Sequence, residues 1–396
     1  MTKDTAPFRS ELRTWLLDYA PKSLYGTRRG PLEGYSGGHK GPPAAPDVLL
    51  WCLMMAERGL TAPTWPAMYG GGGLSTEQGA ILDEELARLR LPPPLVGFGP
   101  TTLGATLLEL GSARQKAEHL PPICRGDVRW CEGSYEANSG SERASLATVA
   151  VRDGHDFVVR GEKIWSLSAD ISDWMFCLVG TSYGAKKAEG MTCLLIDMAT
   201  SGIGVRKMRL ISGPSAFCEV SFSDVRVPEN QVVLGVGAGR DVFAALRRHE
   251  RLIFGFSGGQ MRDDAEASLV ALAREVYGAG KGALSAAVLR DAIAGVGMEA
   301  MCLALTSMRL RQEMDTAGDV VDDSAVLKVV GSELTQRRWE LAMRILGPEG
   351  VGWQGDAFAP AELQTCRDWL RSQGATIEDG TSEAHLSAIA QRLLGP

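Results

Sequence analysis

The feature that most constrains the fold of this chain is a central region of strand-like sequence between two helical regions. Residues from about 128 to 230 contain short apolar runs bounded by turn-forming residues, and no amphipathic helical pattern separates these runs. The clearest runs are residues 157–159, 174–179 and 193–196, and residues 218–222 alternate between apolar and polar with a period of two. Strands at this density predict a compact antiparallel barrel or sandwich rather than a parallel sheet with crossover helices.

Apolar residues recur at helical spacing on both sides of this region. Residues 75–78 (Ser-Thr-Glu-Gln) match a capping box that starts an amphipathic helix. Residues 286–314 and 324–346 are long amphipathic segments largely free of Gly and Pro, which predicts an antiparallel helical bundle. We therefore predict an α+β multi-domain fold with an N-terminal helical domain (residues 1–127), a middle antiparallel β-barrel domain (128–236) and a C-terminal four-helix bundle (237–396).

Composition and charge exclude several classes of protein. The 396 residues are 45% hydrophobic and 22% charged, which is typical of a globular protein. A net charge of -7 disfavours a nucleic-acid or anionic-membrane partner. No apolar run approaches the ~18 residues that span a bilayer, and the N-terminus does not resemble a signal peptide. The eight cysteines form no C-x-x-C pair and the five histidines are scattered, so we predict reduced thiols, no metal site and a cytoplasmic protein.

Two glycine-containing segments match known motifs only in part. In residues 235–239 (Gly-Val-Gly-Ala-Gly), the third glycine of a dinucleotide-binding loop would fall at Arg240. Residues 255–259 match G-x-S-x-G, but the preceding residues 246–251 have a charged, helical pattern instead of a buried strand. Neither a Rossmann site nor a hydrolase nucleophile is therefore predicted.

Four stretches, in chain order, resemble the acyl-CoA dehydrogenase family. Residues 63–74 contain a Pro-Thr-Trp-Pro segment followed by a Gly-rich turn, and residues 130–142 look like the flavin-binding segment of that family. Residues 161–174, which begin Gly-Glu-Lys-Ile-Trp, and residues 377–395, which include Glu-Asp-Gly-Thr-Ser-Glu, complete the resemblance. The members that look nearest are the isovaleryl-type and the steroid-degrading bacterial ones.

This resemblance implies FAD-dependent α,β-dehydrogenation of an acyl thioester in lipid or steroid metabolism. In this reaction a carboxylate removes the α proton, and the β carbon transfers a hydride to flavin N5. Because the α proton is only weakly acidic, the thioester carbonyl needs hydrogen-bond donors and the base must be a carboxylate in a dry pocket. The resemblance also implies acyl-CoA or an acyl-carrier thioester as substrate, electron-transfer flavoprotein as acceptor, and a homo- or hetero-oligomer (dimer or tetramer).

The resemblance offers two positions for the base. Some members carry it in a Glu-Arg pair, here Glu250-Arg251, and others carry it before the C-terminal Gly-Thr, here Asp379. We favour Glu250, because Asp379 is one methylene shorter than Glu at a site that needs near-contact geometry. The structural alternatives are an ion pair between Glu250 and Arg247 on the same helix, and a helix-terminal role for Asp379.

The other predicted site residues follow from the same resemblance. The flavin-binding candidates are Ser134, Tyr135, Ser141, Trp165, Ser166, Leu167, Arg274, Gly380 and Thr381, and the substrate-binding candidates are Arg251, Ser141 and Glu378. Tyr135 and Leu167 depart from the family, because Ser or Thr usually contacts the flavin ring at these positions. Leu167 has no hydrogen-bond donor in its side chain, and a slight shift of register would let Ser166 or Ser168 supply the hydroxyl group instead.

These departures keep two alternatives open. The first is a flavin oxidase or monooxygenase of the same fold that resembles nitroalkane oxidase, with Asp379 as base. The second is a non-catalytic or flavin-free subunit of a heteromeric dehydrogenase, because the loss of polar contacts around the ring weakens flavin binding.

Overall fold

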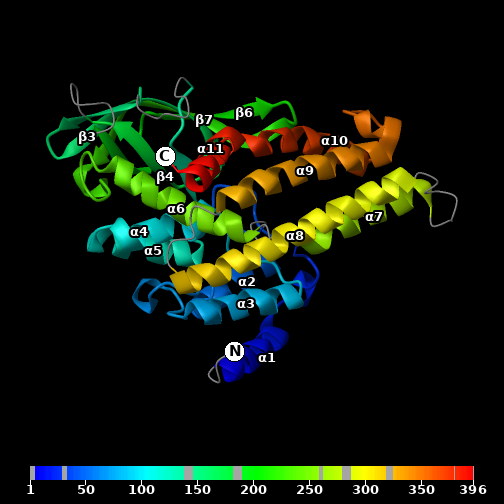
Figure 1. Ribbon diagram of the computed structural model, residues 1–396. Coiled ribbons are helices and arrows are strands. Elements are labelled where there is room, and N and C mark those ends of the chain that lie inside the picture. The colour runs from blue at the N-terminus through cyan, green and yellow to red at the C-terminus, as the bar shows by residue number, and fades with distance from the viewer. Residues whose placement is uncertain are drawn as a thin grey trace. The chain divides into compact units, whose positions relative to one another are not determined.

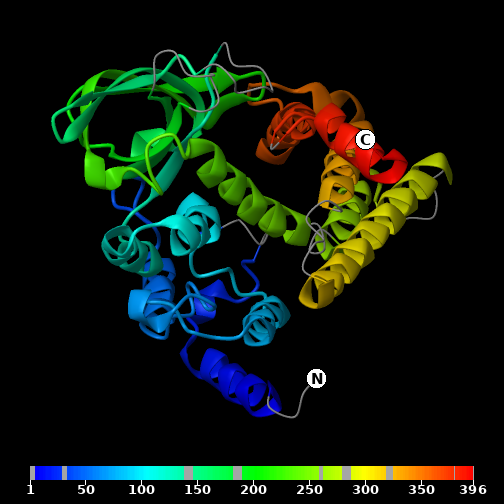
Figure 2. The ribbon, with the colours of Figure 1, turned by 60° about the vertical axis from the view of Figure 1, so that its left-hand side comes forward.

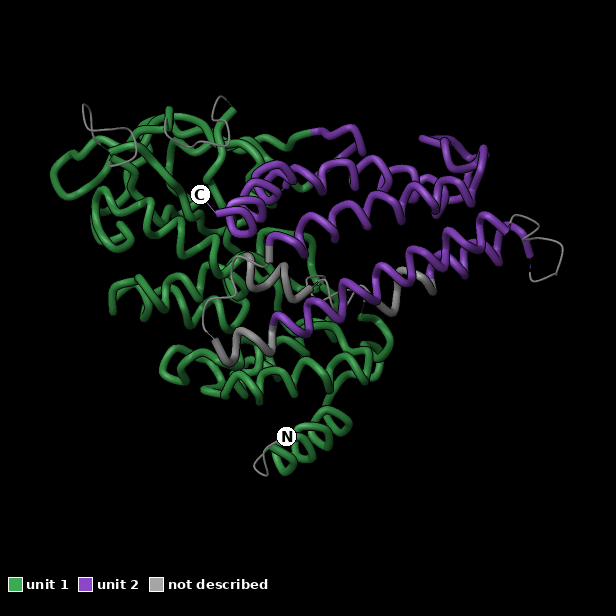
Figure 3. Tube along the Cα trace, viewed as in Figure 1, with its two compact units in different colours: residues 1–208, 216–250 green, residues 209–215, 251–396 purple. Residues whose placement is uncertain are grey.

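The computed structural model describes most of the chain, which divides into two compact units (Figure 3). Unit 1 comprises residues 1–208 and 216–250, and unit 2 comprises residues 209–215 and 251–396. Within these units the described residues are 5–28, 34–137, 146–181, 190–257, 262–278, 287–317, 324–378 and 380–395, of which 251–257, 262–267, 311–317 and 324 are described by their backbone alone.

The N-terminal part of unit 1 is helical. Its helices are α1 (Thr5–Tyr19), α2 (Pro46–Glu57), α3 (Thr76–Arg88), α4 (Gly104–Leu110) and α5 (Ala113–Arg125), and α6 (Gly239–Ser257) begins in this unit. Figures 1 and 2 show the sheet, the α4–α5 pair, the α2–α3 pair and α1 following one another along the unit. The predicted capping box starts α3: the Ser75 hydroxyl accepts a hydrogen bond from the Gln78 N–H (3.2 Å), and the Gln78 side chain accepts one from the Ser75 N–H (3.0 Å).

Seven strands of the described chain form one sheet. They are β1 (Trp130–Gly133), β2 (Val149–Asp153), β3 (Asp156–Leu167), β4 (Trp174–Gly180), β5 (Met191–Asp197), β6 (Ile203–Leu210) and β7 (Gly213–Pro228). Their order is β1-β4-β2-β3-β7-β6, and β5 pairs with β4. The β2–β3, β3–β7 and β4–β5 pairs are antiparallel, whereas β1–β4 and a short contact of β2 with β4 are parallel.

The middle of the sheet is buried on both faces, because side chains of a strand alternate between two hydrophobic clusters. On β4, Phe176 packs in a cluster with α4, α5 and α6, whereas its neighbours Met175 and Cys177 pack in a cluster formed by the strands. This is why the β4 sequence is an uninterrupted apolar run. The first cluster also includes Val242 and Leu246, which fix α6 against the sheet.

Unit 2 is a helical bundle. It contains α7 (Arg262–Tyr277), α8 (Ala287–Ala317), α9 (Ser324–Leu346), α10 (Pro360–Ser372) and α11 (Ser382–Leu394). Helix α9 contacts α7, α8, α10 and α11, and α7 also contacts α8, as can be followed in Figure 1. Apolar residues at helical spacing, such as Leu327, Leu334 and Leu341 on α9, form the core of this bundle.

The predicted α+β fold class is confirmed, but the described strand pairings do not close the sheet into a barrel, and the sheet differs from the prediction in one further respect. The strand-rich region lies between two helical regions of the chain, and the two segments predicted as long helices are α8 and α9. The sheet is mixed rather than wholly antiparallel, because β1 pairs with β4 in parallel. Ser257, the serine of the G-x-S-x-G match, belongs to helix α6 and not to a turn between a strand and a helix. This match therefore does not mark a hydrolase nucleophile.

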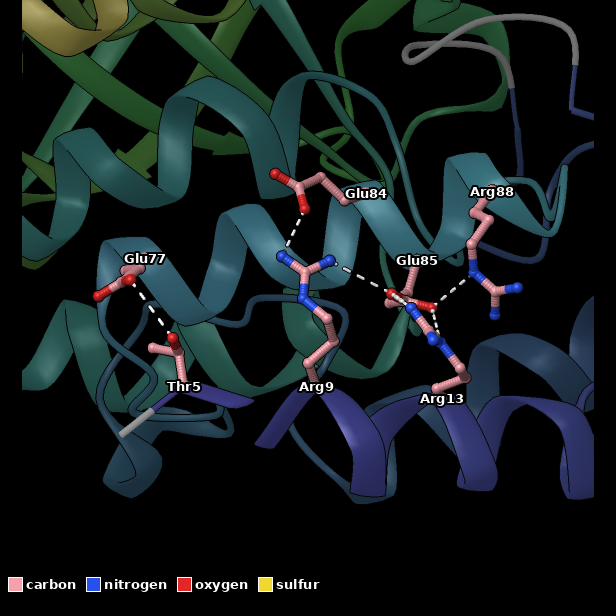
Figure 4. Close-up of polar contacts among 7 residues, drawn as sticks. All are labelled: Thr5, Arg9, Arg13, Glu77, Glu84, Glu85 and Arg88. Carbon is pink, nitrogen blue, oxygen red and sulfur yellow. Dashed lines mark hydrogen bonds and ion pairs between the residues drawn. The ribbon is translucent and has the colours of Figure 1, made fainter. Parts of the chain in front are cut away.

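A cluster of ion pairs joins α1 to α3 in unit 1 (Figure 4). The Glu85 side chain on α3 is 1% exposed. It accepts hydrogen bonds from three arginines: Arg13 (2.9 and 2.7 Å), Arg88 (2.9 Å) and Arg9 (3.2 Å). The hydrogen bonds from Arg13 lower the pKa of Glu85 to about 2; burial acts in the opposite direction, and Arg88 and Arg9 add to the lowering.

Glu85→Gln is expected to reduce the free energy of unfolding by about 2–3 kcal/mol at neutral pH. The pKa of Glu85 in the fold lies below its ordinary value of 4.5. The ionised carboxylate therefore stabilises the fold above that value, and this contribution is lost as the pH falls toward about 2. Urea unfolding of both proteins at several pH values should give stabilities that converge in acid. Glu84→Gln, which removes a 61% exposed carboxylate from the same helix, is the control and should change stability by less than about 1 kcal/mol.

Candidate active site

Helix α6 holds Glu250 against the sheet of unit 1. Val242 and Leu246 are fully buried in the cluster that joins α6 to the sheet. Glu250 follows at the same four-residue spacing, so its side chain starts from the same face of the helix. The Glu250 side chain is 12% exposed. The carboxylate is therefore held close to an apolar core and is largely shielded from solvent.

Arg247 connects Glu250 to the sheet. Its Nη1 donates a hydrogen bond to Glu250 Oε2, and its Nη2 donates one to Oε1 of Glu132 on β1. The guanidinium carbon also lies 4.6 Å from the ring centre of Phe243 and 5.8 Å from that of Tyr135. A single arginine thus contacts the predicted base, strand β1 and a residue that is predicted to bind flavin.

The two residues between Arg247 and Glu250 bind helix α4. Nη2 of Arg248 lies 2.7 and 2.5 Å from the two carboxylate oxygens of Glu109, and Nε2 of His249 lies 3.0 Å from Glu109 Oε2. Burial raises the pKa of Glu109, but the hydrogen bonds and charges of Arg248 and His249 outweigh burial and lower this pKa overall. These partly exposed ion pairs join α6 to α4.

The predicted flavin-binding segment forms an open apolar face on the sheet. Tyr135 is paired with Ile164 of β3, whose N–H donates to the Tyr135 carbonyl oxygen (2.9 Å). Trp165 and Leu167 of β3 are 44% and 54% exposed, and the Trp165 ring meets the Phe217 ring edge-on at 5.8 Å. Neighbouring large apolar side chains that remain exposed are typical of a binding surface.

The backbone of β3 is irregular at this face. The register of β3 against β7 shifts between Lys163 and Ser166. Trp165, within this shift, has a φ of 59°, in the left-handed region that non-glycine residues seldom adopt. Bulges of this kind redirect side chains and occur often beside active sites.

The hydroxyl groups of Ser134 and Ser166 are buried and not exposed at the open face. Both residues are fully buried, and within the described residues neither hydroxyl has a hydrogen-bond partner. Ser166 is buried, whereas its neighbours Trp165 and Leu167 are exposed. Ser166 therefore does not place its hydroxyl where Leu167 lacks one.

A buried ion pair that the sequence analysis missed supports the same segment. Lys163 of β3 is fully buried, and its Nζ lies 2.6 Å from Oε1 of Glu136, whose side chain is 5% exposed. Glu136 also accepts hydrogen bonds from the N–H groups of Ala147 (2.6 Å) and Thr148 (3.1 Å). Burial raises the pKa of Glu136, but the charge of Lys163 and these hydrogen bonds outweigh burial and lower it. The sequence did contain an indication that Lys163 is buried, because this residue occupies an inward position in the alternating pattern of β3.

The C-terminal candidates belong to unit 2. Glu378 is paired with Arg371 through both of its carboxylate oxygens. Thr381 is the N-cap of α11, because its hydroxyl accepts a hydrogen bond from the Ala384 N–H (3.2 Å). Gly380 has a φ of 97°, which favours glycine at this position. The sequence before α11 thus forms a capped helix start.

Arg274 is exposed near the C-terminal end of α7. The N–H of Gly278 donates to the Arg274 carbonyl oxygen (2.9 Å) and closes the helix. Asp379 and Ser141 lie outside the described residues, as does the side chain of Arg251. Among the candidates of unit 1, the described contacts link Glu250 through Arg247 to Tyr135, and Tyr135 to Ile164 of β3.

Three domain models of one family match consecutive parts of the chain. The N-terminal domain of acyl-CoA dehydrogenases matches residues 45–127, the middle domain matches residues 131–225, and the C-terminal domain matches residues 237–394. The chain belongs to the acyl-CoA dehydrogenase family. This confirms the resemblance found in the sequence, and the prediction of an acyl-CoA dehydrogenase-like oxidoreductase that acts on a CH–CH bond.

Relatives within this family are similar along the whole chain. Acyl-CoA dehydrogenase IpdE1 of Mycobacterium tuberculosis is 31% identical over 393 residues, which cover 99% of this chain and 98% of that protein. The structure of the Tcur3481-Tcur3483 steroid ACAD has a TM-score of 0.77 at 24% identity and covers 100% of this chain and 98% of that chain. The structure of the ChsE4-ChsE5 complex from Mycobacterium tuberculosis has a TM-score of 0.76 at 25% identity and covers 100% and 99% of the two chains.

Acyl-CoA dehydrogenases are flavoproteins, which agrees with the FAD implied by the sequence. Among the described residues, none of the helices combines the length and the apolar character needed to cross a bilayer.

Proposed function

We propose that this chain dehydrogenates an acyl thioester between its α and β carbons, with FAD as cofactor and Glu250 as base. The observation that carries this proposal is the placement of Glu250. It is a largely buried carboxylate, and Arg247 links it to the segment around Tyr135 that resembles the flavin-binding segment of the family. A base for a weakly acidic α proton has to be shielded from water and close to the cofactor face.

The open face of the sheet fits the ring system of FAD. Trp165 and Leu167 present exposed apolar surface beside a bulge in β3, and Tyr135 is bridged to the residue before Trp165. An apolar face that is open at a strand irregularity suits a flat aromatic group. The residues that we assign to FAD in unit 1 are Tyr135, Trp165 and Leu167. When bound, FAD supplies the acceptor for the hydride that leaves the β carbon.

Glu250 acts on the α carbon. Its carboxylate takes up the proton as the α C–H bond breaks, and the electron pair of that bond moves toward the thioester carbonyl. The packing of α6 on the sheet keeps bulk solvent from the carboxylate, so that its charge acts at low dielectric. The charge that develops on the carbonyl oxygen has to be stabilised by hydrogen-bond donors.

The proposed substrate is a bulky acyl-CoA of lipid or steroid breakdown. Support comes from relatives in the family, which include a protein described as a steroid ACAD. The ChsE4-ChsE5 complex supports an oligomer in which this chain assembles with a different subunit. We also propose electron-transfer flavoprotein as the electron acceptor, on the strength of the family alone.

The visible absorbance spectrum of the purified protein tests the proposed function. We expect flavin bands to remain after FAD is added and free FAD is removed by desalting. The bands should bleach when a matching acyl-CoA is added without oxygen, and the panel should range from short straight chains to steroid-like acyl groups. Protein that stays colourless after this treatment would contradict dehydrogenase activity of the chain alone. Rapid reoxidation of the bleached flavin by oxygen would indicate an oxidase instead.

A further inference from the structure

The cluster of Glu132, Arg247 and Glu250 carries an inference about how the proposed base is held. One guanidinium group serves two carboxylates: its Nη1 donates to Glu250 and its Nη2 donates to Glu132. The side chains of all three residues are at most 17% exposed. Charge-assisted hydrogen bonds between groups that are shielded from solvent are stronger and more directional than those at a surface.

The contact with β1 gives the cluster a rigidity that the helix alone does not provide. Arg247 and Glu250 are three residues apart on α6, and such pairs on an exposed helix contribute little and leave both side chains mobile. Here Glu132 holds the guanidinium from the sheet side. The rings of Phe243 and Tyr135, 4.6 and 5.8 Å from the guanidinium carbon, limit its movement further. The Glu250 carboxylate therefore has one preferred direction.

Glu132 also balances the charge of the cluster when a proton is transferred. Before transfer, two carboxylates share one guanidinium. After Glu250 takes up a proton, Arg247 still has the Glu132 carboxylate as its partner, so no uncompensated cation remains in a largely buried position. If Glu132 were neutral, Arg247 would favour the ionised form of Glu250 more strongly and would oppose its protonation.

We propose that Arg247 is the positioning residue for the Glu250 carboxylate, and that Glu132 holds Arg247 and balances its charge during proton transfer. This inference rests on the proposed function of Glu250 as base. It also accounts for Tyr135, which stands where the family usually has Ser or Thr, because its ring lies beside the guanidinium.

Single-turnover reduction of the flavin tests this proposal in the FAD-loaded protein. Arg247→Gln and Glu132→Gln are each expected to slow reduction by an acyl-CoA about 10–100-fold and to raise the isotope effect of α-deuterated acyl-CoA. KM should stay unchanged, because the proton-transfer step is the one affected, and rates are compared per bound FAD because Arg247 lies beside Tyr135. Arg247→Lys should reduce flavin faster than Arg247→Gln, because lysine keeps the positive charge but lacks the bidentate geometry of the guanidinium group.

The matched control is Arg248→Gln, because Arg248 is the next residue of α6 and is paired with Glu109 instead. Rates and isotope effects within about twofold of the control would overturn the proposal.

A second measurement needs no turnover. Thermal unfolding of Arg247→Gln, Glu250→Gln and the double variant should give midpoint shifts that do not add, because the two residues share one contact. Additive shifts would overturn the positioning role. Wild-type protein that binds FAD but is not reduced by any acyl-CoA would overturn the proposed function instead. The two failures are thus distinguishable.

Discussion

Replacing Glu250 with Gln is expected to abolish reduction of the flavin by acyl-CoA while FAD stays bound. Gln has nearly the shape of Glu but cannot accept the α proton, so the rate of flavin reduction should fall about 10²–10⁴-fold or more. FAD content should not change, because Glu250 lies on α6 and not on the apolar face around Trp165. Anaerobic stopped-flow absorbance measures the rate, and the spectrum of the desalted protein measures the bound flavin.

Asp379→Asn separates the two positions that the family allows for the base. If Glu250 is the base, Asp379→Asn should keep most of the wild-type rate of reduction. If Glu250→Gln still reduces the flavin and Asp379→Asn does not, the base is Asp379. The same outcome would favour the chemistry of a nitroalkane-oxidase-like member of the fold.

Lys163→Met is expected to reduce the free energy of unfolding by about 3–5 kcal/mol. The substitution keeps most of the apolar length of the side chain but removes the cation that compensates Glu136. The Glu136 side chain is 5% exposed, so its charge would stay buried without the cation that Lys163 supplies. Because Tyr135 precedes Glu136, we also expect weaker binding of FAD. Urea unfolding followed by tryptophan fluorescence measures the first effect, and titration with FAD measures the second.

Arg160→Met provides the matched control for this loss of stability. Arg160 lies on the same strand, and its ion pair with Asp224 is exposed, with 65% and 63% of the two side chains accessible. Its loss should change the stability by no more than about 1 kcal/mol. Lys163→Met combined with Glu136→Gln should recover part of the stability lost in Lys163→Met, because the unpaired charge is gone. Equal losses in Lys163→Met and Arg160→Met would contradict a structural role for the buried pair.

The elements of the fold were predictable where the signal is local. Residues 75–78 carry both halves of a capping box, and the apolar runs at 174–179 and 193–196 lie in β4 and β5. These signals depend on spacing over a few residues. The parallel pairing of β1 with β4 was not predictable, because strands that are separated along the chain leave no local mark of the partner that each will take.

The candidate site was predictable only in part. Glu250 was found through a continuous Glu-Arg motif, and its ion pair with Arg247, three residues away, was the structural alternative considered for it. Glu132 was not singled out, because it lies 115 residues from Arg247 in the sequence. Lys163 and Glu136 were missed for a similar reason: a single charged residue in a sequence is most simply interpreted as solvated.

By itself, the sequence determined the family and the order of helical and strand-rich regions, and it offered Glu250 and Asp379 as candidate bases. The tertiary structure alone decided that Glu132 would share Arg247 with Glu250, and that β3 would bury the Ser166 hydroxyl and leave Leu167 on the open face. The physical reason is that these features depend on different distances along the chain. Periodicity, capping and motif spacing act over a few neighbouring residues, whereas burial and ion pairing depend on which distant segments are packed together.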